Sequence, residues 1–288
     1  MGGPTFYIVD VFAEEKYAGN QLAVIQDAGG LSDEEMQGIA AEMNYSETTF
    51  VLSDEERNGG YDVRIFTPKE EVPFAGHPTL GTAHVIAREI QAEPAERVVL
   101  NLKVGQIPVS LGDVSWMRQP SPTFGRTFAI GRLSRVLGLE DADLDERYPI
   151  QEISTGLPCI VAPLRSLGAL RRCRVNADAY HELVSTARAK GILVFSPEPH
   201  DKADLSARFF ADYYGVPEDP ATGSANGCLA GYLVEHEYFD MAPIDVRVEQ
   251  GYEIGRPSLL YLRAEKAEDE ITVAVGGKVQ MVAKGGFY

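Results

Sequence analysis

The sequence has few cysteines and no cysteine motif. Its three cysteines, Cys159, Cys173 and Cys228, are an odd number, are widely spaced and form no CxxC pair. A disulfide framework and a cysteine-based metal site are therefore not expected. The pattern instead predicts three reduced thiols in a cytoplasmic protein.

Basic residues and long hydrophobic runs are also scarce. Lys and Arg number 26 against 43 Asp and Glu, which gives a formal charge of −17. This charge argues against nucleic acid and against an anionic membrane surface as partners, because both bind clustered Lys and Arg. The start, MGGPTFYIVD, lacks the basic and apolar regions of a signal peptide, and charge-free stretches such as 72–87 are shorter than a membrane span. The composition favours a soluble protein without a membrane partner.

What the sequence does contain is an internal repeat. Residues 77–83, HPTLGTA, match residues 219–225, DPATGSA, at an offset of 142. Three weaker pairs follow at similar offsets: GNQLAVI (19–25) with GLPCIVA (156–162), FVLS (50–53) with LVFS (193–196), and VGQIPVSL (104–111) with QGYEIGRP (250–257). Such self-similarity predicts two homologous halves, 1–118 and 119–288, joined by a Pro-rich crossover at 118–126. The last strand could cross back to the first half.

The predicted elements of the two halves agree with a duplication. Ser32 and Glu35 are spaced as a capping box, which predicts an amphipathic helix over 32–43, and 177–189 is its counterpart, closed by Gly191. Short strands outnumber helices. The segments after Pro78 and Pro220 are apolar or small nearly all round, which is typical of buried helices. The predicted class is α+β, with a barrel-like mixed sheet wrapped around a central buried helix in each half.

The starts of these two helices are the candidate site. Proline is favoured at the first helical position, so Pro78 and Pro220 are expected to begin the helices, with His77 and Asp219 just before them. A helix start rich in glycine and small hydroxyls can bind a carboxylate or phosphate. If a pseudo-twofold axis relates the halves, both helix starts would face one cleft between the domains.

Each candidate also has a plainer interpretation. His77 could bond to the backbone, Asp219 could cap its helix, and Ser224 could serve only as a small residue. Glu47, in NYSETTFV, could be a surface charge on an edge strand, and Cys228 fits the core. The equivalence of positions 77 and 219 favours function, because both then carry titratable groups.

Motifs for cofactors are missing. The sequence has no GxGxxG, P-loop or GxSxG motif. The other histidines, at positions 84, 181, 200 and 236, show no spacing suited to a metal ion. No nucleotide or metal cofactor is predicted.

Several long motifs carry a resemblance to a known family. They are VDVFAEEKYAGNQLAVI, NYSETTFV, FTPKEEVPFAGHPTLGTAHVI, DPATGSA and QGYEIGRPS. The sequence resembles the PhzF family of phenazine biosynthesis-like proteins, which has the diaminopimelate epimerase fold. The resemblance implies two pseudo-symmetric halves, each a barrel-like sheet around a central helix, with the active site between them. A homodimer is a family-level expectation.

The resemblance also implies roles for single residues. Glu47 would be the general acid/base, with His77 and Asp219 as further catalytic residues that line the substrate pocket. The expected substrate-binding residues are Ser46, Gly76, Gly223 and Ser224. One departure is GNQ at 19–21, where the family usually has GNP. This change is expected to lie in a turn and to leave the chemistry intact.

Two functions remain open at this stage. The first is a cofactor-independent isomerase that moves a proton on a small carboxylate-bearing substrate. The second is a small-molecule binding or regulatory protein that keeps the cleft without turnover. The acid at Glu47 favours the enzyme. Racemases of this fold use a cysteine at each helix start, and neither FAGHPTLG nor EDPATGS contains one, so a two-thiol mechanism is disfavoured.

Overall fold

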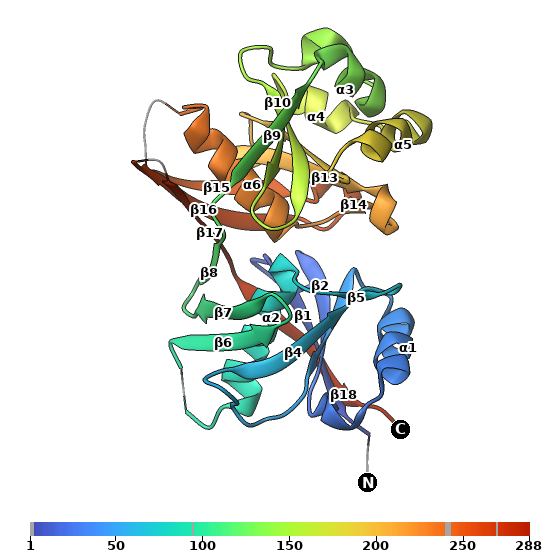
Figure 1. Ribbon diagram of the computed structural model, residues 1–288, viewed down its shortest axis with the longest axis vertical. Helices are drawn as coiled ribbons and strands as arrows, with labels where there is room; N and C mark the ends of the chain where they lie inside the picture. Colours follow the sequence, from blue (N-terminus) through green and yellow to red (C-terminus); the bar gives the residue numbers. More distant parts are fainter. Residues whose placement is uncertain (1–2, 94, 240–242, 269) are drawn as a thin grey trace. The chain divides into compact units, whose positions relative to one another are not determined.

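The computed structural model describes residues 3–93, 95–239, 243–268 and 270–288 (Figure 1). The chain forms two compact units. The first comprises residues up to Arg118 together with Gly276–Tyr288, and the second comprises Gln119–Val275. The last strand therefore belongs to the first unit rather than to the second half of the sequence.

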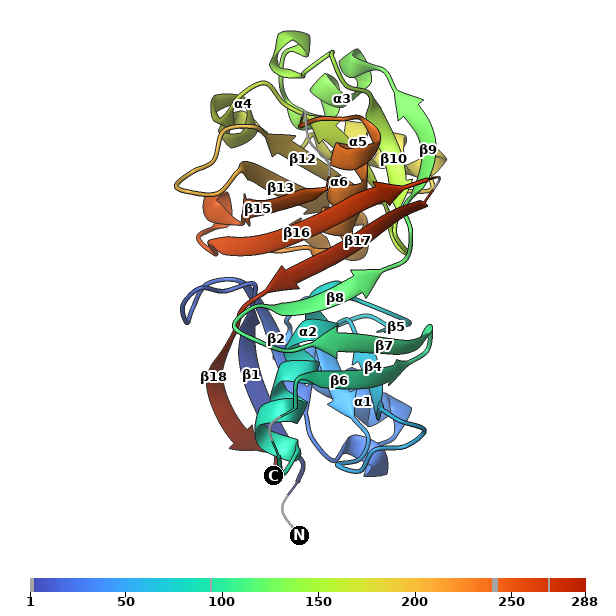
Figure 2. The ribbon, with the colours of Figure 1, turned by 90° about the vertical axis from the view of Figure 1, so that its left-hand side faces the viewer.

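The first unit is mostly strands. Its described elements are β1 (Thr5–Val11), β2 (Asn20–Ile25), α1 (Asp33–Met43), β3 (Glu47–Val51), β4 (Tyr61–Phe66), β5 (Glu71–Val72), α2 (Gly76–Val85), β6 (Arg97–Leu102), β7 (Gly105–Ser110), β8 (Ser115–Gln119, which ends at the boundary) and β18 (Val279–Gly286). β1 lies between β2 and β18 and pairs with both in antiparallel fashion (Figure 2).

The second unit has more helices around its strands. Its described elements are β9 (Thr123–Phe128), α3 (Ile130–Leu137), β10 (Ile150–Ser154), β11 (Pro158–Pro163), α4 (Leu167–Arg172), α5 (Ala177–Thr186), β12 (Gly191–Ser196), β13 (Leu205–Ala211), β14 (Val216–Asp219), α6 (Gly223–Glu235), β15 (Ile244–Gln250), β16 (Ser258–Ala267) and β17 (Glu270–Gly277, which crosses the boundary). A short helical turn, η5 (Tyr252–Ile254), joins β15 to β16.

Strand pairing follows the same order in both units. In the first unit, β1–β2 is antiparallel, β2–β3 parallel, β3–β4 antiparallel, β4–β6 parallel and β6–β7 antiparallel. In the second unit, the same alternation runs through β10–β11, β11–β12, β12–β13, β13–β15 and β15–β16. Three of the four repeated sequence pairs fall on or next to equivalent elements. The fourth does not, because 104–111 covers β7 whereas 250–257 covers the turn after β15.

Helix α2 is buried in the first unit. Every residue from Gly76 to Ala83 is buried, and the helix contacts β1, β2, β3, β6, β7 and β18. A methyl group on Gly81 would lie 2.6 Å from the Leu22 side chain and 2.8 Å from the Val11 side chain, so a larger residue would require these side chains to shift. The small, apolar composition of the segment is thus explained by contact on all its sides.

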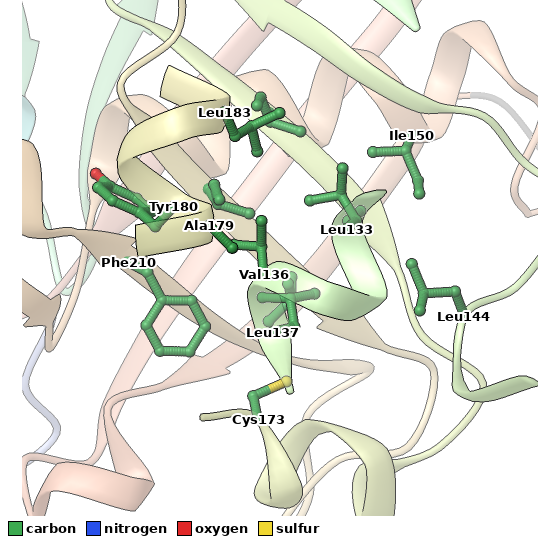
Figure 3. Close-up of a cluster of buried hydrophobic side chains, with 14 of the residues drawn as sticks. Leu133, Val136, Leu137, Leu144, Ile150, Cys173, Ala179, Tyr180, Leu183 and Phe210 are labelled. Carbon is green, nitrogen blue, oxygen red and sulfur yellow. The ribbon is translucent and has the colours of Figure 1, made fainter. Parts of the chain in front are cut away.

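Helix α6 is buried in the second unit in the same way. All its residues from Gly223 to Val234 are buried, and it contacts β10, β11, β12 and β16. A separate hydrophobic cluster lies under α3 and α5, where Val136 packs beside Ala179 (Figure 3). This cluster gives the second unit a core that does not depend on α6 alone.

Helix α1 begins and ends close to where the sequence predicts. Ser32 is its N-cap and exchanges the two hydrogen bonds of a capping box with Glu35. The predicted counterpart, α5, ends at Thr186 rather than near Gly191, because Ala187 is extended and Gly191 already belongs to β12. Among the described residues, no helix is long and apolar enough to cross a membrane.

Candidate active site

Glu47 is the first residue of β3. The four residues after it are buried, whereas the Glu47 side chain is 19% exposed. β3 pairs with β2 on one side and β4 on the other, so Glu47 does not lie on an edge strand. The carboxyl group is held at the end of an internal strand, where it is partly open to solvent.

His77 lies against Glu47. The His77 Nε2 atom is 3.4 Å from the Glu47 Oε2 atom, and the His77 side chain is only 5% exposed. A buried hydrogen bond of 2.7 Å between Thr49 of β3 and Thr82 of α2 fixes the strand against the helix. The structure therefore brings together the two titratable residues that the sequence singled out in the first unit.

The His77 ring is neutral near pH 7. Burial lowers the pKa of His77 to about 3, although a hydrogen bond to the backbone of Gln21 opposes this shift. The predicted turn at Gln21 is wrong, because Gln21 is the second residue of strand β2. Its peptide group is thus rigidly placed to orient the imidazole ring.

The contacts of the ring also define which nitrogen carries the proton. Nε2 is buried and makes no hydrogen bond. A hydrogen bond to backbone that raises a histidine pKa is donated by the ring, so Nδ1–H donates to the Gln21 carbonyl. Nε2 of the neutral ring then directs its lone pair toward Glu47. A protonated Glu47 could donate to it, and the two side chains together can hold one movable proton.

The remaining candidates of the first unit adjoin this pair in the chain. Ser46 is half-buried and directly precedes Glu47, and Gly76 is the buried first residue of α2. The predicted start of α2 at Pro78 is wrong, since the helix begins at Gly76 with Ala75 as its N-cap. Proline at the third helical position loses no hydrogen bond, because the first N–H groups of a helix have no partner within it.

The candidates of the second unit lie where β14 leads into α6. Asp219 is the last residue of β14 and is 9% exposed, and Ser224 in the first turn of α6 is 8% exposed. The predicted helix start at Pro220 is wrong, because α6 begins at Gly223 with Thr222 as its N-cap. Asp219 pairs with Phe209 of β13, and this strand contact keeps the chain extended before the helix.

Both buried helices begin without a side-chain cap. Helices α1, α4 and α5 have caps from Ser32, Ser166 and Asn176, whereas α2, α3 and α6 have none. At Gly76 and Gly223 the chain carries no side chain that could compete for the first N–H groups. Uncapped helix starts of this kind can stabilise a carboxylate or an enolate-like charge.

A match to a protein family covers nearly the whole chain. The sequence model of the family described as phenazine biosynthesis-like protein (PhzC-PhzF) matches residues 9–285. The chain belongs to this family. The resemblance seen in the sequence motifs is thereby confirmed.

Individual relatives of this PhzF-family protein agree with that assignment. The trans-2,3-dihydro-3-hydroxyanthranilate isomerase of Pseudomonas aeruginosa is 36% identical, with 98% of this chain and 99% of that protein covered. The structure of a PhzF-family phenazine biosynthesis protein of Bacillus anthracis is 28% identical, covers 100% of both chains and has a TM-score of 0.91. Curated relatives are named isomerases, and the present PhzF-family protein is an isomerase.

The fold extends beyond the PhzF family. A probable proline racemase of Agrobacterium radiobacter is only 8% identical but has a TM-score of 0.63, with 98% of this chain and 92% of that chain covered. This likeness concerns the fold alone. The fold is a sheet-dominated α+β fold of the kind found in epimerases and racemases.

The cysteines of this PhzF-family chain lie away from the helix starts. Cys159 on β11, Cys173 after α4 and Cys228 in the middle of α6 are all buried free thiols. None is among the first residues of α2 or α6. Within the described ranges, no group of three or more His, Cys, Asp or Glu residues could hold a metal ion.

One segment that contacts a candidate site residue was missed by sequence reasoning. Gln250, at the end of β15, donates a hydrogen bond of 2.9 Å to the Asp219 carbonyl. Gly251 follows with φ +79°, and a methyl group there would lie 2.6 Å from the Pro220 carbonyl oxygen and still closer to the Arg256 carbonyl oxygen. The motif QGYEIGRPS, which begins at Gln250, was the sequence signal for this segment.

We expect Gly251→Ala to destabilise the second unit by about 1–3 kcal/mol, because the left-handed backbone disfavours a side chain and the added methyl group would clash with the Arg256 and Pro220 carbonyls. Gly255→Ala is the matched control, since Gly255 has φ +71° and nothing within 4 Å of the added methyl group. Urea unfolding of the two variants measures the difference. Equal losses of stability in the two variants would contradict a cost from the close approach of position 251 to the Arg256 and Pro220 carbonyls.

Proposed function

We propose that this protein is a cofactor-independent isomerase that moves a proton on a small carboxylate-bearing substrate. Glu47 is the general acid/base. The observation that carries the proposal is the Glu47–His77 contact, in which a carboxyl group at the end of an internal strand faces a buried neutral imidazole at 3.4 Å.

The proposed reaction conserves atoms and electrons. The Glu47 carboxylate takes a proton from a carbon of the substrate, and the electron pair of that C–H bond spreads into the adjoining π system. The Glu47 carboxyl group then returns a proton to another carbon of the same system. No oxidant, reductant or metal is needed, because the product differs from the substrate only in the positions of a hydrogen and the double bonds.

His77 supports Glu47 in its protonated state. Its Nε2 lone pair accepts a hydrogen bond from the Glu47 carboxyl group after proton abstraction, while Nδ1–H remains bonded to Gln21. A neutral imidazole adds no positive charge that would hold Glu47 ionised. This arrangement favours a carboxyl group that both takes and returns a proton.

The remaining candidate residues are assigned separately in each unit. Ser46 and Gly76 are assigned to substrate binding beside the Glu47–His77 pair. Asp219 is assigned to catalysis, and Gly223 and Ser224 to substrate binding, because DPATGSA resembles the corresponding family motif. The uncapped start of α6 supports an anion-binding role for this segment.

The proposed substrate class comes from the relatives. The Pseudomonas aeruginosa relative is named for the isomerisation of trans-2,3-dihydro-3-hydroxyanthranilate. We propose a substrate of the same kind, a small unsaturated ring that bears a carboxylate together with amino or hydroxyl groups. Such a ring provides the conjugation over which the charge of the proton shift spreads.

We also propose that the two halves are pseudo-symmetric products of a duplication, each a barrel-like sheet around a central helix. The identical order of strand pairings supports this proposal, as does the burial of α2 and α6.

Deuterium incorporation tests the proposed reaction. The wild-type protein in D₂O should introduce one deuterium from solvent into trans-2,3-dihydro-3-hydroxyanthranilate or a related cyclic amino or hydroxy acid, without any added cofactor. Mass spectrometry measures the label, and a chelator should not change its rate. Saturable binding of these compounds without any exchange would favour a binding protein instead.

A further inference from the structure

The buried side chain of Gln250 makes hydrogen bonds to Asp219 and to the segment that follows it, at Thr222 and Asn226. It is 1% exposed. Its Nε2 donates to the Asp219 carbonyl (2.9 Å), and its Oε1 accepts from Asn226 Nδ2 (2.8 Å) and from the backbone N–H of Thr222 (3.3 Å). A carbonyl can only accept and a backbone N–H can only donate, so these partners fix the orientation of the amide.

This orientation determines the direction of a second hydrogen bond. The Gln250 Nε2 atom is 3.3 Å from Thr222 Oγ1 and can only donate to it. The Thr222 hydroxyl proton is then free to point elsewhere, and it donates to Asp219 Oδ2. The result is a one-way chain of donors from Gln250 through Thr222 to the Asp219 carboxyl group.

Charged and titratable groups of the neighbouring elements have interactions of their own. Arg208 of β13 pairs with Glu218 of β14 (2.7 Å), and Asp212 pairs with His181 (2.9 Å). Glu253 of η5 pairs with His200 (3.1 Å), and Tyr252 of η5 stacks on the His200 ring. Glu249 of β15 accepts hydrogen bonds from the backbone N–H groups of residues 200–203. Arg256, two residues after η5, is a further charged group of this segment.

We propose that Gln250 and Thr222 are positioning residues that hold the Asp219 carboxyl group as an ionised hydrogen-bond acceptor. An ionised carboxylate accepts hydrogen bonds at both oxygens, and a hydrogen bond donated to the charged form favours that form. The role of Asp219 in turnover rests on the proposed function, whereas the hydrogen-bond chain itself does not.

The proposal gives the amino or hydroxyl groups of the proposed substrate a partner in the protein. A buried acceptor that is held ionised matches a substrate group that donates hydrogen bonds, such as an amino, ammonium or hydroxyl group. The substrate would then carry such a donor for Asp219 in addition to its own carboxylate. A ligand with a carboxylate and no donor should bind more weakly.

Thr222→Val tests the chain, with Thr222→Ser as its conservative partner. Valine has the shape of threonine but cannot donate, so the pKa of Asp219 should rise by about 1–2 units, the effect of losing a hydrogen bond to a charged group. Serine keeps the hydroxyl group and should restore the wild-type value. Carbon-13 NMR of the Asp219 carboxyl group, assigned with Asp219→Asn, measures this without substrate.

Gln250→Glu provides a second route if Thr222→Val does not fold. A carboxylate at position 250 accepts the Thr222 proton and repels Asp219, so the Asp219 titration should again move to higher pH. Gln151→Glu is the matched control. Gln151, in the same unit, donates a hydrogen bond of 3.1 Å to the Gly125 carbonyl and is not part of the Gln250–Thr222–Asp219 hydrogen-bond chain. In the Gln151→Glu variant, the Asp219 carboxyl group should therefore titrate as it does in wild type.

Kinetics separate this proposal from the proposed function. In an active enzyme, Thr222→Val should move the acid limb of the kcat/KM profile to higher pH by the same 1–2 units. If the wild-type protein shows no turnover, the proposed function is overturned. The NMR titration of Asp219 then tests the hydrogen-bond chain by itself. An unchanged Asp219 titration in a folded Thr222→Val or Gln250→Glu protein would overturn the chain.

Discussion

Glu47→Gln is expected to lower the turnover rate by about 10²–10⁴-fold while leaving the affinity for substrate nearly unchanged. Glutamine keeps the shape of the side chain and can hydrogen-bond to His77 Nε2, but it cannot accept a proton. The variant should also lose exchange of solvent deuterium into the substrate. Calorimetry measures the binding, and mass spectrometry measures the exchange.

The matched control is Glu42→Gln, which makes the same chemical change at an exposed position of α1. It should retain the wild-type rate. Exchange at the wild-type rate in Glu47→Gln would assign the proton transfer to another group, and Asp219 would be the next candidate. A parallel loss of binding and rate would instead make Glu47 a residue that binds substrate.

Local sequence rules predicted the surface elements well. Helix α1 begins at its capping box because Ser32 and Glu35 satisfy each other's backbone N–H groups, an interaction within four residues. The burial of α2 and α6 was equally readable, because their lack of charged residues leaves no face suited to water. These predictions needed no knowledge of tertiary contacts.

The starts of the buried helices were mispredicted for a physical reason. The preference of proline for the first helical position is small beside tertiary contacts. In the first unit the helix includes two residues before Pro78, and in the second the pairing of Asp219 with Phe209 delays the helix until Gly223. The aligned residues His77 and Asp219 therefore differ in local structure, one helical and the other in a strand.

The partners of the site residues could not be read from spacing. Glu47 and His77 are thirty positions apart and meet because β3 and α2 pack together, which depends on the whole first unit. The contact of Gln250 with Asp219 and Thr222 spans about thirty residues and depends on the parallel pairing of β13 with β15. The motif QGYEIGRPS pointed to the segment, but only the structure shows its hydrogen bonds.

The buried His77 ring should make the protein sensitive to acid. The pKa of His77 is lowered to about 3 in the folded protein, whereas a histidine in the unfolded chain titrates near 6.5. Between these values the unfolded chain binds a proton that the folded protein does not. Stability is therefore retained above about pH 6.5 and is lost as the pH falls toward 3, by about 1.4 kcal/mol per unit and about 4–5 kcal/mol in all.

His77→Asn isolates this effect, because asparagine places an amide near the position of Nδ1 and can still donate to the Gln21 carbonyl. At pH 8 both side chains are neutral, and the difference in unfolding free energy reflects packing and hydrogen bonding alone. Between pH 6.5 and 4, wild type should lose about 3 kcal/mol more than the variant, as measured by urea unfolding at each pH. Curves that stay parallel over this range would mean that the folded protein accepts a proton on His77 as readily as the unfolded chain. The inference that burial keeps the imidazole neutral below pH 6.5 would then be wrong.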